Sequence, residues 1–238
     1  CFTNMYCQSP VCVPARASML SGKYVFQHRV NDNTQLLPEC SYSFAADLKK
    51  NGYVTVAVGR THHIDNGYTV VPVPIRDSFE FITEKYPFYG ISDFYSDRTL
   101  ERTNSSMDIR ATETACEFLE DLSLRQPFCL HLGLLAPHNP FALPEPYASM
   151  YDPETIDIPE KLQIADIPPM LAGKYSWQAK ITEKELREAT AFYYGMITLL
   201  DDCVGMIVDK LKKLGLYDNT LLIFVSDHGD MIGERRLY

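Results

Sequence analysis

The residues best suited to chemistry lie near the start of the chain, where Cys12 is followed four positions later by Arg16. Pro14 is a natural residue for the first turn of a helix, residues 15–20 are compatible with a helix, and Gly22 would end it. Cys12 would then sit at the helix entrance, where unpaired N–H groups favour negative charge. Such a cysteine is either a free thiol at a helix cap or a low-pKa thiolate nucleophile. Arg16, one turn further along, is placed to reach back to Cys12 or to an anion beside it.

A second candidate is the dipeptide formed by Asp227 and His228. It brings a carboxylate oxygen and an imidazole nitrogen together, which suits a divalent cation that takes oxygen ligands plus one nitrogen. Two residues do not make a site, because a hard cation takes about six ligands. Taken alone, the dipeptide fits an exposed surface loop slightly better than a metal site.

Three short apolar runs predict the strands that would position these residues: 53–58, 128–135 and 221–225. Their apolar character is continuous, which is typical of a parallel sheet covered on both faces. Four of the six histidines follow directly on these runs: His62, His63, His138 and His228. One histidine in a loop is as often solvated as functional. Histidines after three strands indicate an active site, because ligands bind beyond the carboxyl ends of such strands.

Helical patterns alternate with these runs over residues 43–51, 109–122 and 182–214. Thr182 and Glu185 form a capping-box pattern at the start of the longest helix, and Gly215 fits its end. The alternation predicts an α/β fold with a mostly parallel central sheet flanked by helices. Residues 137–180 are rich in proline and are predicted to form an irregular insertion, a lid or a substrate-facing segment.

Composition limits the classes of partner. The 238 residues carry a net charge of −9, with 46% hydrophobic and 22% charged residues, as in an ordinary globular protein. This charge argues against nucleic acid, so an anionic substrate would need a local positive site. No apolar run approaches the roughly 20 residues that span a bilayer. The seven cysteines lack a repeating spacing, which favours buried thiols over disulfides and slightly favours the cytoplasm over the periplasm or an extracellular site.

The segment from Cys12 to Arg16, followed by Leu20-Ser21-Gly22, resembles the Cys-x-Pro-x-Arg…Leu-x-Gly signature of type I sulfatases, which are formylglycine-dependent members of the alkaline-phosphatase superfamily. The resemblance implies that a maturation enzyme converts Cys12 to formylglycine (3-oxoalanine), so the thiol itself does not attack. One oxygen of the hydrated aldehyde would attack sulfur. The other would then expel sulfate by re-forming the aldehyde.

The resemblance extends over nearly the whole chain. Residues 136–141 look like a Pro-His-x-Pro-Phe loop, which makes His138 a sulfate-binding or leaving-group residue. Residues 226–230 look like a metal-binding Asp-His-Gly-Asp segment. The resemblance implies a divalent cation held by modified Cys12, Asp227 and His228, with calcium expected and manganese or magnesium as alternatives.

The resemblance gives roles to two further polar residues. Arg16 would hold the diol and the metal ligands in place electrostatically. Asn33 matches an asparagine that contacts the substrate anion in some subfamilies, and an Asx turn is an equally good interpretation of it.

The chain departs from the family pattern in two ways. Arg60 stands where the family usually has lysine, so a planar guanidinium group replaces the compact ammonium charge. His62 is chosen as the catalytic histidine that follows, with His63 as an alternative contact to substrate. The second departure concerns length. The family's N-terminal metal-binding aspartates would precede Cys1 and a late lysine would follow Tyr238, so residues 1–238 are expected to form an incomplete sulfatase catalytic domain.

The predicted function is hydrolysis of a small sulfate ester of a sugar, aryl or alkyl alcohol. Cys12, Arg16, Arg60, His62 and His138 are the expected catalytic residues, with one of the two histidines acting as general acid to the leaving alcohol. Three alternatives stay open: a phosphonate monoester or phosphodiester hydrolase of the same superfamily, a non-catalytic sulfatase-like binding protein, and a thiol hydrolase that uses unmodified Cys12.

Overall fold

The computed structural model describes residues 1–35, 42–60, 69–71, 106–123, 127–138, 141, 143–159 and 181–233. The chain divides into two compact units. The first comprises residues 1–73, 111–134 and 204–229, and the second comprises residues 74–110, 135–203 and 230–238. The described helices are α1 (Cys12–Ser21), α2 (Val25–His28), α3 (Phe44–Lys50), α5 (Met107–Leu122) and α7 (Glu183–Lys213), with 3-10 turns η2 (Tyr147–Ser149), η3 (Pro153–Thr155) and η6 (Tyr217–Asn219).

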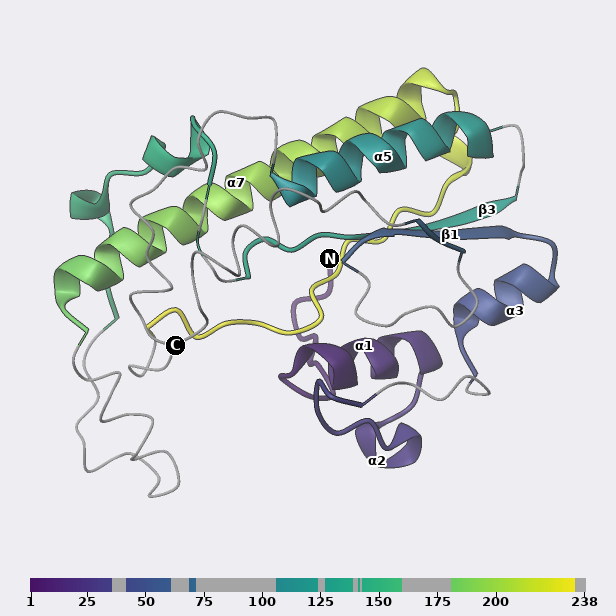
Figure 1. The fold of residues 1–238 in the computed structure, drawn as a ribbon, viewed down its shortest axis with the longest axis horizontal. Coiled ribbons are helices and arrows are strands. Elements are labelled where there is room, and N and C mark those ends of the chain that lie inside the picture. Colours follow the sequence, from purple (N-terminus) through teal and green to yellow (C-terminus); the bar gives the residue numbers. More distant parts are fainter. Residues whose placement is uncertain are drawn as a thin grey trace. The chain divides into compact units, whose positions relative to one another are not determined.

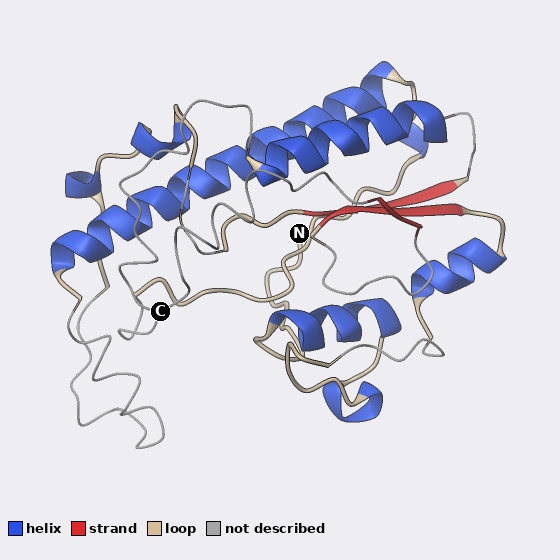
Figure 2. Ribbon diagram, viewed as in Figure 1, coloured by secondary structure: helices blue, strands red, loops and turns tan. Residues whose placement is uncertain are grey.

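The first unit contains a parallel sheet of three strands, β1 (Val54–Gly59), β2 (Thr69–Val71) and β3 (Phe128–Gly133), in the order β2-β1-β3. The central strand β1 pairs with both neighbours, and its Val56 lies opposite Thr69 on β2 and opposite Leu130 on β3. Figure 2 shows these strands in red between layers of blue helices. The predicted α/β fold with a mostly parallel sheet is therefore confirmed.

Alternation along the strands divides the core of this unit between the two faces of the sheet. Val54, Val56 and Val58 pack on one face with α5 and the last turns of α7. Ala57 packs on the other face with Leu20 of α1 and with α3. Figure 1 shows β1 and β3 between α5 on one side and α1 and α3 on the other. The sheet therefore holds α1 against the face opposite α5.

Local signals in the sequence place the helix ends correctly. The Ser43 side chain accepts a hydrogen bond from the Ala46 N–H and caps α3. Thr182 and Glu185 form the expected reciprocal capping box at the start of α7. Left-handed glycines end two helices, with φ of 65° at Gly22 and 69° at Gly215. Each of these signals acts within a few residues, so tertiary contacts are not needed to establish it.

Helix α7 is, within the described residues, long and apolar enough to cross a membrane when judged by length and composition alone. Core helices of soluble proteins meet the same criterion. One stripe of α7 is buried in this structure, as a core-packing helix requires; its buried apolar residues include Leu186, Met196, Leu199, Cys203, Ile207 and Leu211.

The prediction of a strand over residues 221–225 is wrong. Leu221 to Val225 has no strand assignment, and its five apolar side chains are 38–85% exposed. Apolar composition makes a strand only where a neighbouring strand accepts and donates the backbone hydrogen bonds. In the part of the chain that the structure describes, no strand pairs with this segment. The short strand β2 is the converse case, because the sequence did not indicate it.

Strand β3 ends at Gly133, two residues earlier than predicted, because two glycines approach closely there. A Cβ on Gly59 would lie 2.2 Å from the Gly133 carbonyl oxygen, and a Cβ on Gly133 would lie 2.2 Å from the Arg60 carbonyl oxygen. Gly59 also has a φ of 83°. Only glycine fits both positions, and the chain leaves the sheet beyond them.

The second unit has its own apolar cluster, in which Phe141 and Leu143 pack with Met196 and Leu199 of α7. The predicted insertion at residues 137–180 lies in this unit and contains η2 and η3. Its residues 139–140, 142 and 160–180 lie outside the described residues. Its role as a lid or a substrate-facing segment stays a prediction.

Candidate active site

The first turn of α1 is capped by a residue from elsewhere in the sequence. Val11 stands at the N-cap position with no side-chain cap of its own. The Asn33 side chain instead accepts a hydrogen bond from the Val13 N–H at 2.9 Å. The Ala15 N–H bonds the Val11 carbonyl, and Pro14 has no N–H. In the described part of the chain, the N–H groups of Val11 and Cys12 are thus the donors left for a ligand at the start of α1, and the helix dipole favours an anion there.

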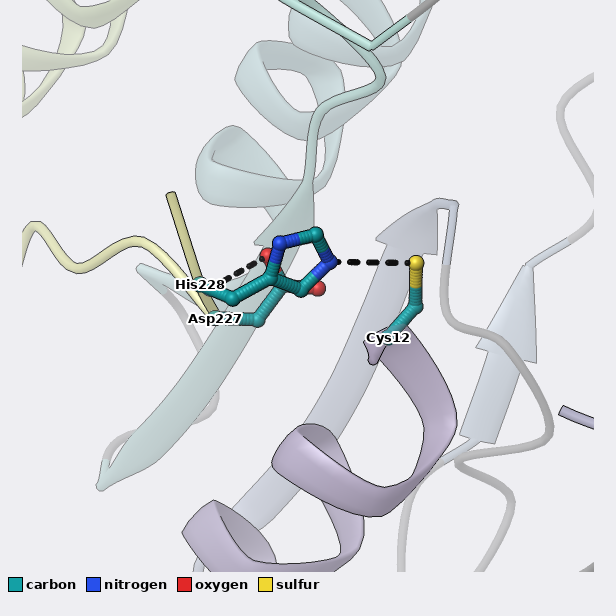
Figure 3. A group of neighbouring side chains, drawn as sticks. All are labelled: Cys12, Asp227 and His228. Carbon is teal, nitrogen blue, oxygen red and sulfur yellow. Dashed lines mark hydrogen bonds between the residues drawn. The ribbon is translucent and has the colours of Figure 1, made fainter. Parts of the chain in front are cut away.

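Cys12 lies at the entrance of α1, as predicted, with 8% of its surface exposed. Its Sγ lies 3.3 Å from Nε2 of His228, and Figure 3 shows the two side chains facing each other beside Asp227. One ligand atom from each of Cys12, Asp227 and His228 lies within 4.8 Å of the others. The chain therefore brings together the three residues that were predicted to share a cation.

Hydrogen bonds determine which nitrogen of His228 can bind a cation. Its Nδ1 lies 2.9 Å from the Gly229 carbonyl oxygen. A carbonyl oxygen only accepts, so Nδ1 carries the proton and Nε2 presents a lone pair. Nε2 is the nitrogen that faces Cys12. The donor set of one imidazole nitrogen and one carboxylate oxygen beside position 12 therefore fits a divalent cation.

Arg16 connects three segments of the site. Its Nε donates to Asp227 Oδ2 at 2.7 Å and its Nη1 donates to the Arg60 carbonyl oxygen at 2.7 Å. Burial raises the pKa of Asp227, but the hydrogen bond and charge of Arg16 outweigh this effect and hold that pKa below its usual value. Asp227 is therefore ionised at neutral pH. Because Asp227 balances the charge of Arg16, this arginine orients the carboxylate and adds no net positive charge.

Arg60 contributes its backbone carbonyl oxygen, which accepts from Arg16, and its N–H donates to the Gly133 carbonyl oxygen at 2.7 Å. Arg60 directly follows Gly59, which has a φ of 83° at the end of β1, and the hydrogen bond from Arg16 joins the Arg60 carbonyl oxygen to α1. The close pair of Gly59 and Gly133 is thus linked to the site through Arg60. The sequence indicated a role for the Arg60 side chain and gave no sign of this backbone role.

Replacing Arg16 by methionine is expected to lower the free energy of unfolding by about 2–3 kcal/mol, because Asp227 would keep its charge in a partly buried place without its cationic partner. The side chains of this pair are only 13% and 18% exposed. Lys210 and Glu120 form a pair of similar length, 2.6 Å, with 21% and 56% exposure. Lys210→Met should change stability far less, because water screens that pair. Denaturant unfolding of both variants measures the difference, and equal losses would contradict the role assigned to Arg16.

The remaining predicted site residues are distributed as follows. Asn33 does not form the Asx turn considered for it: the turn is made by Asp32, whose Oδ1 accepts from the Thr34 N–H at 2.8 Å. His138 is half-buried and belongs to the second unit, where its N–H bonds the Leu135 carbonyl oxygen at 2.9 Å. His62 and His63 lie outside the described residues.

Two further polar residues were not predicted from the sequence. Asp108 is 5% exposed, and its carboxylate accepts hydrogen bonds from the Leu135 and Ala136 N–H groups at 2.5 and 3.0 Å, just before the His138 loop. His131 interrupts the apolar run of β3. Desolvation, with a smaller contribution from Arg16, lowers the pKa of His131 to about 4. A polar residue inside a strand of otherwise apolar residues was the available signal for His131.

Comparisons relate this chain to known proteins. A family model described as sulfatase matches residues 1–238. Arylsulfatase K of Danio rerio is 28% identical over 263 residues, covering 100% of this chain and 49% of the relative. The choline-sulfatase of Rhizobium meliloti is 27% identical over 270 residues, covering 100% and 52%. The solved phosphonate monoester hydrolase from Silicibacter pomeroyi shares the fold with a TM-score of 0.77 and 24% identity, over 95% of this chain and 55% of that one. The chain spans about half the length of these relatives.

Proposed function

Because the chain belongs to the sulfatase family, we propose that the protein of which it forms part hydrolyses a sulfate ester with Cys12, modified to formylglycine, as the nucleophilic residue. The observation that carries this proposal is the approach of Cys12 to Asp227 and His228, with ligand atoms within 4.8 Å of one another. A free thiol at a helix cap would leave the adjacent carboxylate and imidazole unexplained. A nucleophile beside a cation accounts for all three residues.

The cation is proposed to be calcium, with manganese or magnesium as alternatives, held by Asp227, His228 and residue 12. When bound, it would stabilise the negative charge that develops on the sulfate oxygens. The acidic protein needs the positive charge of the cation, because the charge of Arg16 is already balanced by Asp227. The tautomer of His228 supports the proposal, since the Nδ1 bond to the Gly229 carbonyl oxygen leaves the Nε2 lone pair facing position 12.

Other residues are proposed for the substrate. Asn33 is suited to contact the sulfate, because its Oδ1 is bound to α1 while its Nδ2 donates to no other group in the described residues. His138 and His62 are proposed as sulfate contacts, one of them being the general acid, with His63 as the alternative to His62. Arg60 is proposed to add positive charge. For His138, His62 and His63 the support is the sequence motifs alone.

The partners proposed on this basis are a small sulfated substrate and a maturation enzyme that modifies Cys12. The leaving alcohol can be a sugar, an aryl or an alkyl group, since none of the described site residues selects among them. The chain is similar both to an arylsulfatase K and to a choline-sulfatase, which is consistent with this breadth.

The test is a comparison of kcat/KM for an aryl sulfate and for the matching aryl phosphonate monoester, measured on the full-length protein. We expect the sulfate to be turned over faster by at least roughly ten-fold, which corresponds to a preference of about 1.4 kcal/mol in the transition state. The shared fold with a phosphonate monoester hydrolase makes the reverse outcome informative. Faster turnover of the phosphonate would replace the proposed reaction by phosphonate ester hydrolysis. Absence of both activities, with an unmodified Cys12, would favour a binding protein.

A further inference from the structure

We propose that His28 is a positioning residue: its neutral imidazole fixes the turn that carries Asn33 against the first turns of α1, and so sets the place of Asn33 beside Cys12. This inference rests on the proposed function for its effect on turnover. Its structural part, the link from His28 to the Val13–Asn33 bond, is independent of that function.

The imidazole of His28 joins two elements. Its Nε2 lies 2.8 Å from Oγ of Ser18 on α1, and its Nδ1 accepts a hydrogen bond from the Val30 N–H at 3.1 Å. The three groups are withdrawn from water, with Ser18, His28 and Val30 exposed by 5%, 8% and 1%. Buried hydrogen bonds of this kind are costly to break, because the groups left behind have no solvent to replace the partner.

These contacts also define the protonation state of His28. The Val30 N–H can only donate, so Nδ1 must be unprotonated, and Nε2–H then donates to the Ser18 hydroxyl. Ser18 and His28 are therefore not a nucleophile and base pair, because the imidazole gives its proton to the serine oxygen and has no lone pair facing it. The arrangement serves to hold two segments together.

The segment beyond His28 is placed by two further contacts with α1. The Val30 side chain packs in an apolar cluster with Val13 and Ala17. Three residues later, Asn33 Oδ1 accepts from the Val13 N–H at 2.9 Å. The His28 imidazole, the Val30 side chain and the Asn33 amide thus bind successive points of the same segment to α1.

Internal hydrogen bonds keep this segment folded between its anchoring points. Asp32 Oδ1 accepts from both the N–H and the hydroxyl of Thr34, at 2.8 and 2.6 Å, and Gln35 Oε1 accepts from the Asn31 N–H at 2.6 Å. Because the turn is organised internally, a displacement of Val30 would carry Asn33 with it. The Val30 N–H bond to His28 is therefore the contact through which the imidazole acts on Asn33.

The first measurement needs no activity. Hydrogen exchange at the Val13 amide is followed in the full-length protein, in the wild type, His28→Leu and His28→Asn. We expect His28→Leu to accelerate exchange at Val13 by roughly ten-fold, since it removes the acceptor for Val30. His28→Asn should restore slower exchange, because its side-chain oxygen can accept from the Val30 N–H. Amides of residues 111–122 in α5 should be unchanged, which separates a local effect from general loosening.

Ser18→Ala is the milder variant should His28→Leu fail to fold, because it removes one hydroxyl and leaves the Val30 bond in place. It should accelerate hydrogen exchange at Val13 by a measurable amount that is smaller than the effect of His28→Leu. Unchanged Val13 exchange in every variant that folds overturns the proposal.

The second measurement is a double-mutant cycle on kcat/KM for an aryl sulfate, in which His28→Leu is introduced into the wild-type and the Asn33→Ala backgrounds. If His28 acts through Asn33, the loss in the double variant should be no larger than the greater single loss. Losses that multiply overturn the positioning role. A protein that shows no turnover at all would refute the proposed function, while Val13 exchange would still decide the role of His28.

Discussion

Replacing Cys12 by alanine is expected to lower kcat/KM for a sulfate ester by roughly 10⁴-fold or more, because a covalent nucleophile has no substitute in the site. The fold should persist, since Cys12 is a small side chain at the first position of α1 and alanine favours a helix. Turnover of an aryl sulfate by the full-length protein measures the loss. Thermal unfolding, which should change little, shows that the loss is chemical.

Mass spectrometry of the wild-type peptide that contains Cys12 tests directly whether this residue is modified. Conversion of CH2SH to CHO lowers the mass by about 18 Da, and this change must be absent from the alanine variant. Cys7→Ala is the matched control, because Cys7 is an exposed free cysteine five positions earlier. It should retain activity and the modified peptide. An intact thiol at Cys12 in an active protein, together with inactivation by a thiol reagent, would favour the thiol hydrolase instead.

Replacing Asp227 by asparagine is expected to lower kcat/KM by about 10³-fold, because the site loses the charged ligand that attracts a divalent cation. Asparagine keeps the size and one oxygen, so the main change is electrostatic. Treatment of the wild type with a chelator should have a similar effect, and addition of calcium or manganese should restore turnover in the wild type alone.

A second readout for Asp227 does not depend on turnover. Calcium should raise the unfolding temperature of the chelated wild type, because a cation that binds only the folded protein stabilises it. The Asp227→Asn variant should lose most of this rise. Asp218→Asn, which alters an exposed carboxylate in the 3-10 turn η6, should keep it. Equal stabilisation of all three proteins, or full activity after chelation, would show that Asp227 is not a ligand.

The exposed run Leu221–Val225 shows why apolar composition alone does not predict a strand. The same continuous apolar character predicted β1 and β3 correctly, because each lies in register with the other and shares hydrogen bonds along its length. Residues 221–225 have the same composition, yet they have no strand partner among the described residues. Strand formation is thus a property of a pair of segments, and the composition of a single segment indicates only its propensity to form a strand.

The amino-acid sequence by itself determined the local elements and the chemical candidates. Pro14 and Gly22 delimit α1, Thr182 and Glu185 begin α7, and these signals suffice because they act within one helical turn. The spacing from Cys12 to Arg16 and the dipeptide Asp227-His228 identified the groups that meet at the site, although 216 positions separate Cys12 from His228.

Only the tertiary structure decided how these groups are connected. Arg16 was expected to hold the metal ligands in place, and it binds one of them, Asp227, but it also binds the carbonyl oxygen of Arg60, which no pattern indicated. Asn33 was expected to face substrate or to make a turn, and its oxygen caps α1. His28 carried no signal, because its partner Ser18 lies ten positions away on α1. Contacts between distant residues depend on the packing of α1 against the sheet, and no local pattern encodes them.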